Sequence, residues 1–426
     1  MRGLKRNPWL FGLGLLAIPV WFGGQAQADI NNDQAGSLII FPKVVADGER
    51  DTVIKITNKS NMPAYAHCYY TNALGTCDLA GSSCTDDNDC PGTGDSCNVL
   101  WQATNFDIFL TAQQPTFWRV STGRFGDLLQ PACEMGGSCA CDVNGPSGAL
   151  ECPGFDAGAA GGINSIAIAG TGTDFFGELR CYQTMADQST PLGQNSLVGE
   201  AIIETIASGQ ISTYDAVHVT GIDVGTDLDL LLDNAEYNAC PEQLIFASHG
   251  EGASADIAGV TTTFSTELTL VPCTALYNLA QPVTASVNIF AYDELELRLS
   301  ADGVPVTCFS NNRLDDPDYG GIFDAALGDR DYLKTRIVVN SSDICLTGDN
   351  AGDPCDDDGD CPNFRTTDGG EDLGCRPSPG VVGVVEEFYS TSAGDSGHAA
   401  WSLTQTGSRQ GSDIIANPDL AAGSLP

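Results

Sequence analysis

Short segments in which apolar and polar positions alternate recur along most of the chain. In residues 51–58, Ile54 and Ile56 alternate with Lys55 and Thr57, which is the two-residue period of a strand with one buried face. Such segments are rich in Val, Ile, Thr, Phe and Tyr and are bounded by the turn-forming residues Gly, Pro, Asn and Asp. We expect strands at 37–45, 51–58, 64–71, 106–110, 116–121, 175–183, 197–205, 214–222, 243–248, 261–271, 283–292, 295–300, 304–309, 335–340, 381–389 and 398–403.

Helical periodicity is sparse, and the two best helix candidates, 227–237 and 322–327, are short. Many strands without long helices predict an all-β fold built as an antiparallel β-sandwich. The order of strand, turn, proline and strand at 51–71 resembles immunoglobulin-like modules of bacterial surface proteins. The prediction is therefore one large or two tandem immunoglobulin-like sandwiches, with disulfide-stapled loops rich in Asp and Gly inserted into them.

The stretch GIDVGTDLD, near residue 225, offers a domain boundary. Residues 29–225 would form one β-sandwich with cysteine-rich insertions at 77–97 and 133–174, and residues 226–426 a second one with an insertion at 345–375. A single large sandwich is the alternative.

Residues 1–28 have the three parts of a secretory signal peptide. A basic start with Arg2, Lys5 and Arg6 precedes an apolar stretch, and Ala26-Gln27-Ala28 forms a small-residue cleavage site. The apolar stretch is too short and too interrupted to span a bilayer. We therefore expect a secreted protein, whether extracellular, on the cell surface or periplasmic, with no membrane span in its mature chain. A formal net charge of −38, from 18 Lys and Arg against 56 Asp and Glu, disfavours nucleic acid and anionic membranes as partners.

The chain has 17 cysteines, and in an oxidising compartment most of them should pair as disulfides. Two groups of four share a core that reads Cys, five mostly Asp residues, Cys, Pro. Because the groups are far apart in the sequence, this internal repeat is the most specific signal in the chain. Four cysteines allow three pairings, and the sequence does not choose among them. The first group is Cys77, Cys84, Cys90 and Cys97, and the second is Cys345, Cys355, Cys361 and Cys375.

The other cysteines fall into two sets. One set lies in a Gly-rich stretch without the acidic core and comprises Cys133, Cys139, Cys141 and Cys152. The other set lies in or beside strand-like segments, and we expect its members to form disulfides that staple the scaffold. It comprises Cys68, Cys181, Cys240, Cys273 and Cys308. Since the total is odd, at least one cysteine is unpaired, and we expect it to be buried rather than to join two molecules.

The repeated cores place several carboxylates close together, and such hard oxygen ligands suit Ca²⁺. The candidate ligands are Asp86, Asp87 and Asp89 in the first core and Asp356, Asp357, Asp358 and Asp360 in the second. The second core resembles the Asp-rich, cysteine-punctuated thrombospondin type 3 repeats. It is not an EF-hand, because Cys361 stands at the glycine position and Thr367 at the glutamate position. The alternative is that the aspartates are solvated turn formers.

One motif raises the question of catalysis. Gly394-Asp395-Ser396-Gly397 matches the nucleophile motif of chymotrypsin-like serine proteases, and Ala66-His67-Cys68 resembles the segment that carries their catalytic histidine. That family needs Gly and Pro next, to shape its oxyanion-hole turn, but His398 and Ala399 follow here. A polar turn and a stapled strand explain these segments better, so we expect no enzyme activity. A secreted hydrolase that uses His67 and Ser396 is the alternative.

Three tryptophans and a tyrosine pair raise the question of sugar binding, but burial in a sandwich core is their expected role. They are Trp101, Trp118, Trp401, Tyr69 and Tyr70. The sequence therefore predicts a non-enzymatic extracellular or cell-surface protein, structural or adhesive, with Ca²⁺ as its candidate cofactor. The expected partners are further copies of itself, as in an envelope or filament component, or another cell-surface protein or a glycan.

Overall fold

The computed structural model describes residues 34–85, 89–92, 94–99, 101, 103–124, 168–226, 229–257, 259–277, 282–324, 331–350, 352–366, 370–408 and 413–416. Within these ranges the chain forms mostly antiparallel sheets and short 3₁₀ turns, without an α-helix. The predicted all-β fold is confirmed. The expected signal peptide and the cysteines from Cys133 to Cys152 lie outside the described residues.

The first half of the chain forms an eleven-stranded sheet around an apolar core. The strands run in the order β10-β9-β8-β2-β1-β11-β3-β7, while β12 joins β2 to β13 and β14 pairs with β1. Every long strand of this sheet contributes side chains to one buried cluster, for example Ile39, Ile54 and Leu179. The strands are β1 (Leu38–Ala46), β2 (Arg50–Asn58), β3 (Ala64–Asn72), β7 (Ala103–Leu110), β8 (Pro115–Arg119), β9 (Gly123–Arg124), β10 (Ile168–Ala169), β11 (Phe175–Thr184), β12 (Leu197–Thr205), β13 (Gln210–Asp215) and β14 (Val217–Val219).

The second half forms two five-stranded sheets that pack face to face. One has the order β21-β20-β23-β16-β28, and the other has the order β17-β18-β26-β27 with β22 beside β18. Leu244 and Ile289 of the first sheet share a buried cluster with Leu268 of the second, as in a β-sandwich. The strands are β16 (Pro241–His249), β17 (Ser254–Ile257), β18 (Val260–Pro272), β20 (Thr284–Tyr292), β21 (Arg298–Thr307), β22 (Ser310–Arg313), β23 (Tyr332–Val339), β26 (Val381–Thr391), β27 (Ser396–Ser402) and β28 (Thr404–Ser408). The immunoglobulin-like character of the sandwich stays a prediction.

Smaller elements complete the fold. A three-stranded sheet holds β15 (Leu230–Leu232), β29 (Asp413–Ala416) and β19 (Ala275–Leu276), and a 3₁₀ turn, η3, covers Pro317–Tyr319. The two helices expected from sequence are therefore wrong in their described parts. Residues 230–232 lie in a strand, and residues 321–323 form turns that end in a bridge at Asp324, because pairing with distant strands outweighs weak local helix propensity. The strands expected at 295–300 and 304–309 are parts of the single strand β21.

β1 and β11 are buried along their whole length, which explains the continuous apolar run SLIIFPKVV. One face of this strand pair lies on the core of the first sheet. The other face contributes to a second cluster, which includes Ile40 of β1, Val271 of β18 and Val382 of β26. Because both faces are covered, a polar side chain on either strand must find its partners inside the protein.

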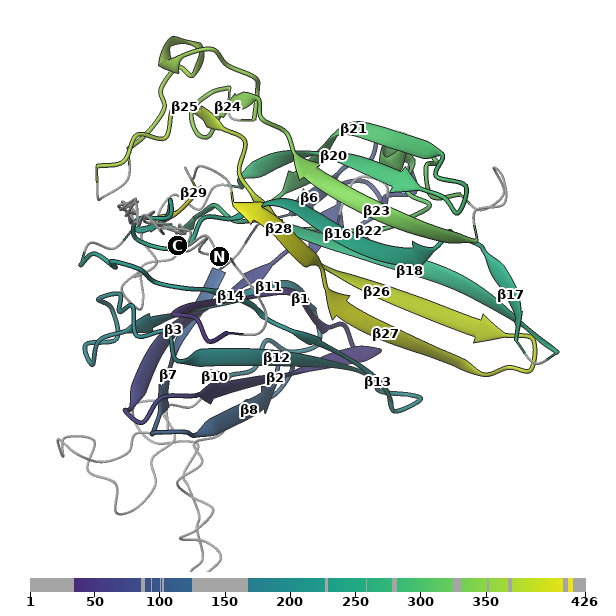
Figure 1. Cartoon of the computed structure of the whole chain (residues 1–426), viewed down its shortest axis with the longest axis horizontal. Helices are drawn as coiled ribbons and strands as arrows, with labels where there is room; N and C mark the ends of the chain where they lie inside the picture. The colour runs from purple at the N-terminus through teal and green to yellow at the C-terminus, as the bar shows by residue number, and fades with distance from the viewer. Residues whose placement is uncertain are drawn as a thin grey trace, which may run out of the picture.

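The two halves of the chain share more than this one cluster. Val384 and Ala400, from β26 and β27, belong to the core of the first sheet. Figure 1 shows the purple and blue strands of the first half at the lower left and the green and yellow strands of the second half at the right, where the β26–β27 hairpin lies beside β13. The last strand of the first sheet ends at Val219, and the next strand, which begins at Leu230, belongs to another sheet. The proposed boundary at residue 225 stays a prediction, and the two segments are packed together through apolar cores.

Candidate functional sites

The two repeated cysteine groups fold as the same small module. In each, the first cysteine pairs with the third and the second with the fourth, giving Cys77–Cys90, Cys84–Cys97, Cys345–Cys361 and Cys355–Cys375. The first and fourth cysteines also lie opposite each other on antiparallel strands in both modules. These strands are β4 (Gly75–Cys77), β5 (Ser83–Cys84) and β6 (Cys97–Val99) in the first module, and β24 (Asp343–Cys345) and β25 (Cys375–Pro377) in the second. The structure thus selects one of the three pairings that the sequence left open.

The turns that follow the first cysteine correspond as well. Gly81 N–H donates to Cys77 O at 2.8 Å, and Gly352 N–H donates to Cys345 O at 2.8 Å. Both glycines have a positive φ, 68° for Gly81 and 92° for Gly352, a conformation that glycine adopts without strain. In both modules a glycine N–H thus closes the first loop on the carbonyl of the first cysteine, and this loop is longer in the second module.

The last aspartate of each acidic core closes the five-residue loop between two cysteines. Asp89 Oδ2 accepts from Thr85 N–H at 2.7 Å, and Asp360 Oδ2 accepts from Asp356 N–H at 2.9 Å. In each module the aspartate before the third cysteine thus binds the N–H of the residue after the second. This is the turn-forming use of an aspartate that the sequence left as the alternative to metal binding.

Two more predicted ligands in the second module bind backbone. Asp357 Oδ1 accepts from Gly359 N–H at 2.7 Å and caps the 3₁₀ turn η5, Asp358–Asp360. Asp358 Oδ1 accepts from Cys375 N–H at 2.8 Å, which ties the acidic core to β25. The Asp356 side chain is exposed. Asp86 and Asp87 of the first core lie outside the described residues.

Metal-ligand geometry is confined, among the described residues, to groups that include disulfide cysteines. Three groups bring ligand atoms within 4.8 Å of one another: three cysteines in each module, and Cys240 with Cys273 and Asp413. All of these cysteines are in disulfides, and the sulfur ligand of a metal is a thiolate. The predicted aspartates do not come together in such a group within the described ranges. Calcium binding stays a prediction.

The structure does not bring His67 and Ser396 together. His67 Nδ1 lies 2.6 Å from Asp107 Oδ1, and its buried Nε2 has no hydrogen-bond partner among the described residues. Ser396 is exposed at the start of β27, where its carbonyl accepts from Gln210 Nε2. Each residue thus has its own strand partners, as expected of a stapled strand and a hairpin end.

The scaffold cysteines follow the prediction with one exception. Cys68–Cys181 links β3 to β11, and Cys240–Cys273 links the start of β16 to the end of β18. Cys308 is free, so its assignment as a staple is wrong. Its Sγ accepts from Val283 N–H at 3.2 Å, and burial raises the pKa of the thiol to about 12. The half-buried Cys308 is the odd cysteine of the described chain.

A cluster of charged and polar side chains lies between the sheets of the two halves. Lys43 Nζ, on β1, lies 2.6 Å from Glu267 Oε2 and 2.8 Å from Glu386 Oε2. Glu386 Oε1 accepts from Ser212 Oγ at 3.0 Å and lies 2.5 Å from His398 Nδ1. These residues, from β1, β13, β18, β26 and β27, form what we call the ionic junction.

A bulge in β1 places Lys43 in this junction. The register against β11 shifts between Phe41 and Val44, and Pro42, which has no N–H, lies in the shifted part. The Tyr214 hydroxyl donates to Lys43 O and accepts from Lys43 N–H. The backbone groups that the bulge removes from the ladder are therefore satisfied inside the core.

Both carboxylates of the junction are held in the charged form. Burial alone would raise the pKa of Glu386, but the Lys43 ammonium, the His398 hydrogen bond and the Arg50 guanidinium lower it far below its ordinary value. The pKa of Glu267 is likewise lowered, because the attraction of Lys43 and Arg50 exceeds the effect of burial. The junction is an ion-pair network, and its groups neutralise one another.

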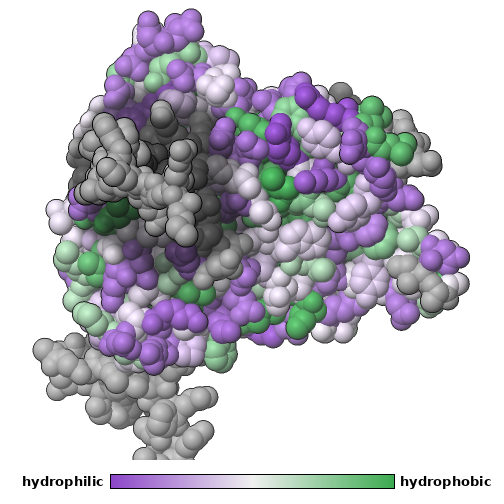
Figure 2. Space-filling model, in the orientation of Figure 1, coloured by the Kyte–Doolittle hydropathy of each residue, from purple (hydrophilic) through white to green (hydrophobic). Residues whose placement is uncertain are grey.

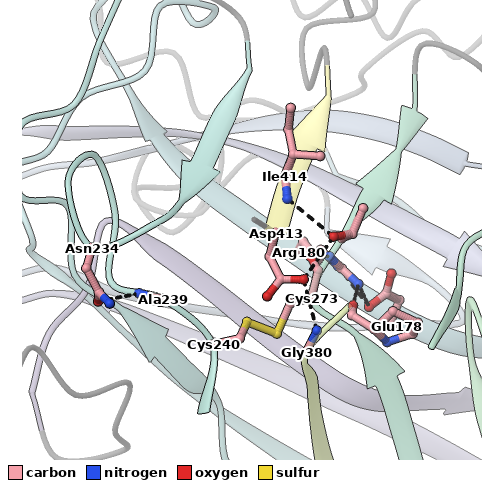
Figure 3. Close-up of a disulfide and its surroundings, with 11 residues drawn as sticks. Glu178, Arg180, Asn234, Ala239, Cys240, Cys273, Gly380, Asp413 and Ile414 are labelled. Atoms are coloured by element: carbon pink, nitrogen blue, oxygen red, sulfur yellow. Dashed lines mark hydrogen bonds and ion pairs between the residues drawn. A yellow bond between two sulfur atoms is a disulfide. The ribbon is translucent and has the colours of Figure 1, made fainter. Parts of the chain in front are cut away.

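A second buried cation joins the halves beside the Cys240–Cys273 disulfide. Arg180 on β11 donates from Nη1 to Cys273 O at 2.7 Å, from Nη2 to Pro272 O at 2.6 Å and from Nε to Glu178 Oε2 at 2.9 Å. Figure 3 shows Arg180 between Glu178 and the chain next to the disulfide. Burial raises the pKa of Glu178, and the ion pair with Arg180 opposes that shift. We call this group the arginine clamp.

The same region holds the last described strand. Asp413 Oδ1, on β29, accepts from Gly380 N–H at 2.9 Å and from Thr274 Oγ1 at 3.0 Å, and the side chain is buried (Figure 3). Sequence patterns alone did not point to the clamp, the junction or Asp413. The signal that could have indicated a buried charge is a charged residue within a long apolar run, such as Lys43 in SLIIFPKVV.

The aromatic residues lie mostly in the cores. Trp118 and Tyr70 are buried, and Trp118 Nε1 donates to the Tyr70 hydroxyl at 2.6 Å. Tyr69 is also buried, while Trp101 and Trp401 are partly buried against apolar clusters. Core packing, the role favoured by the sequence, is confirmed for the buried residues.

No helix among the described residues is long and apolar enough to cross a membrane. Figure 2 shows hydrophilic and hydrophobic residues interspersed over the viewed face. A scan against protein-family models and a search of curated proteins found no match to this chain.

Proposed function

We propose that this protein is an exported, non-enzymatic structural component of the extracellular space or cell surface that assembles through its projecting loops. The six described disulfides support an oxidising compartment, since such bonds form and persist there. The secretory signal expected at residues 1–28 agrees with this location.

The observation that carries the proposal is the folding of two distant segments, 77–97 and 345–375, as the same stapled module on one cross-linked β-scaffold. The second module is anchored through Leu346 and Leu373, which share an apolar cluster with Ile414 of β29. Repetition of a module with so few buried apolar side chains favours a role in contacts outside the scaffold. The second module stands away from the sheets in Figure 1, at the top of the view. The scaffold beneath it is stiffened by the ionic junction and the arginine clamp.

The placement of the histidines supports a structural role over a catalytic one. His67 and Ser396 lie on strands of different sheets, and His398 Nε2 lies 3.4 Å from the Thr205 hydroxyl. A hydrolase of the serine type would need a histidine beside Ser396 with its second nitrogen free to take a proton. Labelling with a serine-directed phosphonate, with Ser396→Ala as the control, tests the alternative: Ser396-dependent labelling would favour the hydrolase.

Calcium would act on the modules, where acidic residues are concentrated in the sequence. The test is the Tm of the metal-free exported chain before and after addition of Ca²⁺, with Mg²⁺ as the comparison ion. A ligand that binds only the folded state raises the Tm. We expect a rise that is specific to Ca²⁺ and that is reduced in the Asp356→Asn/Asp357→Asn variant. An unchanged Tm would remove calcium from the proposal.

Assembly is tested by sedimentation velocity and electron microscopy of the exported chain over a range of concentrations. We expect discrete oligomers or filaments. A chain that remains monomeric and co-purifies with no surface protein or glycan would contradict the structural role.

A further inference from the structure

The outer face of the five-stranded sheet β21-β20-β23-β16-β28 carries a group of cationic and aromatic side chains. On β20 and β23 every second residue is buried in the sandwich core, so the residues between them point outward. Phe290 pairs with Arg336 across the strands, and Tyr292 lies between Arg298 and Lys334. We call Phe290, Tyr292, Arg298, Lys334 and Arg336 the basic face.

Phe290 orders the two arginines. The Arg298 Cζ lies 4.5 Å and the Arg336 Cζ 5.2 Å from the centre of its ring. A guanidinium held over a ring by cation–π attraction is fixed in orientation, and Arg336 is half-buried, with its Nε buried and without a partner among the described residues. Two such groups, with the exposed Lys334 beside them, form a preorganised receptor for carboxylates.

The cations of this face form no direct ion pair within the described residues. Ion pairs hold most of the described cations elsewhere, among them Lys43, Arg119 and Arg313. Arg298, Lys334 and Arg336 have no carboxylate within 4.0 Å in the described ranges. In a chain with 18 cationic and 56 acidic residues, three uncompensated cations on one sheet face are a distinct feature.

Two of the three acidic residues in the β20–β21 turn, Asp293 and Glu294, accept hydrogen bonds from the backbone, and the third, Glu296, is exposed. Asp293 Oδ1 accepts from Leu295 N–H at 2.9 Å and Leu297 N–H at 2.8 Å, and Glu294 Oε1 accepts from Tyr332 N–H at 2.8 Å. The turn places Leu295 and Leu297 at the surface, 80% and 55% exposed. An apolar rim therefore borders the cationic group.

We propose that the basic face binds the second stapled module, residues 345–375, of another copy of this chain. The module holds nine acidic residues and one basic residue, so its charge is complementary to that of the face. Asp353 and Asp356 are exposed. The module projects from the scaffold in Figure 1, and its surface is largely hydrophilic in Figure 2.

Such a contact joins two different surfaces of the same protein. A heterologous contact of this kind closes into a ring or continues as a filament. The high net negative charge of the chain repels other copies, so a cationic face restricts how two copies can meet. The inference rests on the self-assembly in the proposed function and adds the two surfaces that make it.

The experiment is sedimentation velocity of the exported chain at low ionic strength, in which exposed charges are least screened. Lys334→Glu reverses one exposed charge on the face. Lys59→Glu makes the same change at an exposed lysine on the other half of the chain, without an ion pair among the described residues. We expect Lys334→Glu to raise the concentration for half-assembly by at least about tenfold and Lys59→Glu to leave it near that of the unmodified chain.

A charge swap between the two surfaces is the second test of this contact. Asp353→Lys/Asp356→Lys should weaken assembly as Lys334→Glu does, and combining Asp356→Lys with Lys334→Glu in one chain should restore part of it, because opposite charges again face each other. Assembly of the Lys334→Glu variant as strong as that of the unmodified chain would overturn this inference while leaving the proposed function in place. An unmodified chain that never self-associates would overturn the inference and the self-assembly together.

Discussion

Lys43 Nζ lies 2.8 Å from Glu386 Oε2, and both side chains are completely buried. Lys43 belongs to β1 in the sheet of the first half, and Glu386 belongs to β26 in the second half. The pair thus connects strands at opposite ends of the sequence through the interior. Removing one partner of a buried pair leaves an uncompensated charge, which is far more costly than losing an exposed pair.

Replacing Lys43 tests this connection. Lys43→Met should lower the free energy of unfolding by about 3–5 kcal/mol, because Glu267 and Glu386 would lose their shared ammonium. The matched control is Lys55→Met, since Lys55 forms a half-exposed pair with Glu200 and should cost no more than about 1 kcal/mol. Denaturant unfolding measures both, and equal losses would show that the junction carries no special stability.

Acid should weaken the junction. The pKa values of Glu386 and Glu267 are lowered in the folded chain from 4.5, so their contribution is present above about pH 4.5 and is lost as the pH falls. The free energy of unfolding should therefore decrease below that pH, by up to about 1.4 kcal/mol per pH unit for each group. In Glu386→Gln the slope should be shallower. Glu178, whose pKa is raised, contributes the opposite slope, but equally in both proteins, so the difference between the two slopes isolates Glu386. Identical slopes would be the contradicting result.

The arginine clamp needs the planar guanidinium and not only its charge. Arg180→Lys keeps the charge but cannot donate at once to Pro272 O, Cys273 O and Glu178, so we expect a loss of about 1–3 kcal/mol in unfolding free energy. Arg119→Lys is the control, because Arg119 is 42% exposed and its pair with Glu204 lies at the surface. It should cost about 0–1 kcal/mol. If both changes had the same small effect, the clamp would not hold the halves.

Asp89 and Asp360 occupy equivalent positions, so replacing either one should have the same effect on its own module. Asp89→Ala and Asp360→Ala each remove the acceptor that closes a five-residue loop, at a local cost of about 1 kcal/mol, or roughly fivefold more frequent opening of that module. Limited proteolysis with peptide mapping should show faster cleavage within 77–97 or 345–375 and an unchanged scaffold. Asp353→Ala, at an exposed side chain, is the control. Faster cleavage in only one of the two modules would argue against their equivalence.

The free thiol of Cys308 should react slowly in the folded protein. Its pKa of about 12 leaves little thiolate near pH 8, and its sulfur is half-buried. Alkylation without reductant should therefore be slow in buffer and fast in denaturant, with the label found on the Cys308 peptide and absent from Cys308→Ser. A disulfide from Cys308 to a second chain would be incompatible with the free thiol.

Much of the secondary structure was readable from the sequence. The alternation in 51–58 and 283–292 predicted β2 and β20 closely, and the continuous apolar run at 37–45 corresponds to β1, which is covered on both faces. These patterns are local, because they record which side of a strand faces water. The repeated Cys, five residues, Cys, Pro core likewise predicted two related modules.

Long-range pairing was decided only by the tertiary structure. Four cysteines allow three pairings in each module, and their spacing does not rank them. Lys43 finds Glu267 and Glu386 only because β1, β18 and β26 stack, and 56 acidic residues offered no means of choosing those two from the sequence. Residues 230–232 became a strand for the same reason, since a distant strand supplied hydrogen bonds that weak local helix preference could not match. The sequence thus determined which segments bury one face as strands and which contain the cysteines of the stapled modules. The packing of distant strands determined which charged side chains form ion pairs, which cysteines form disulfides and which strands pair.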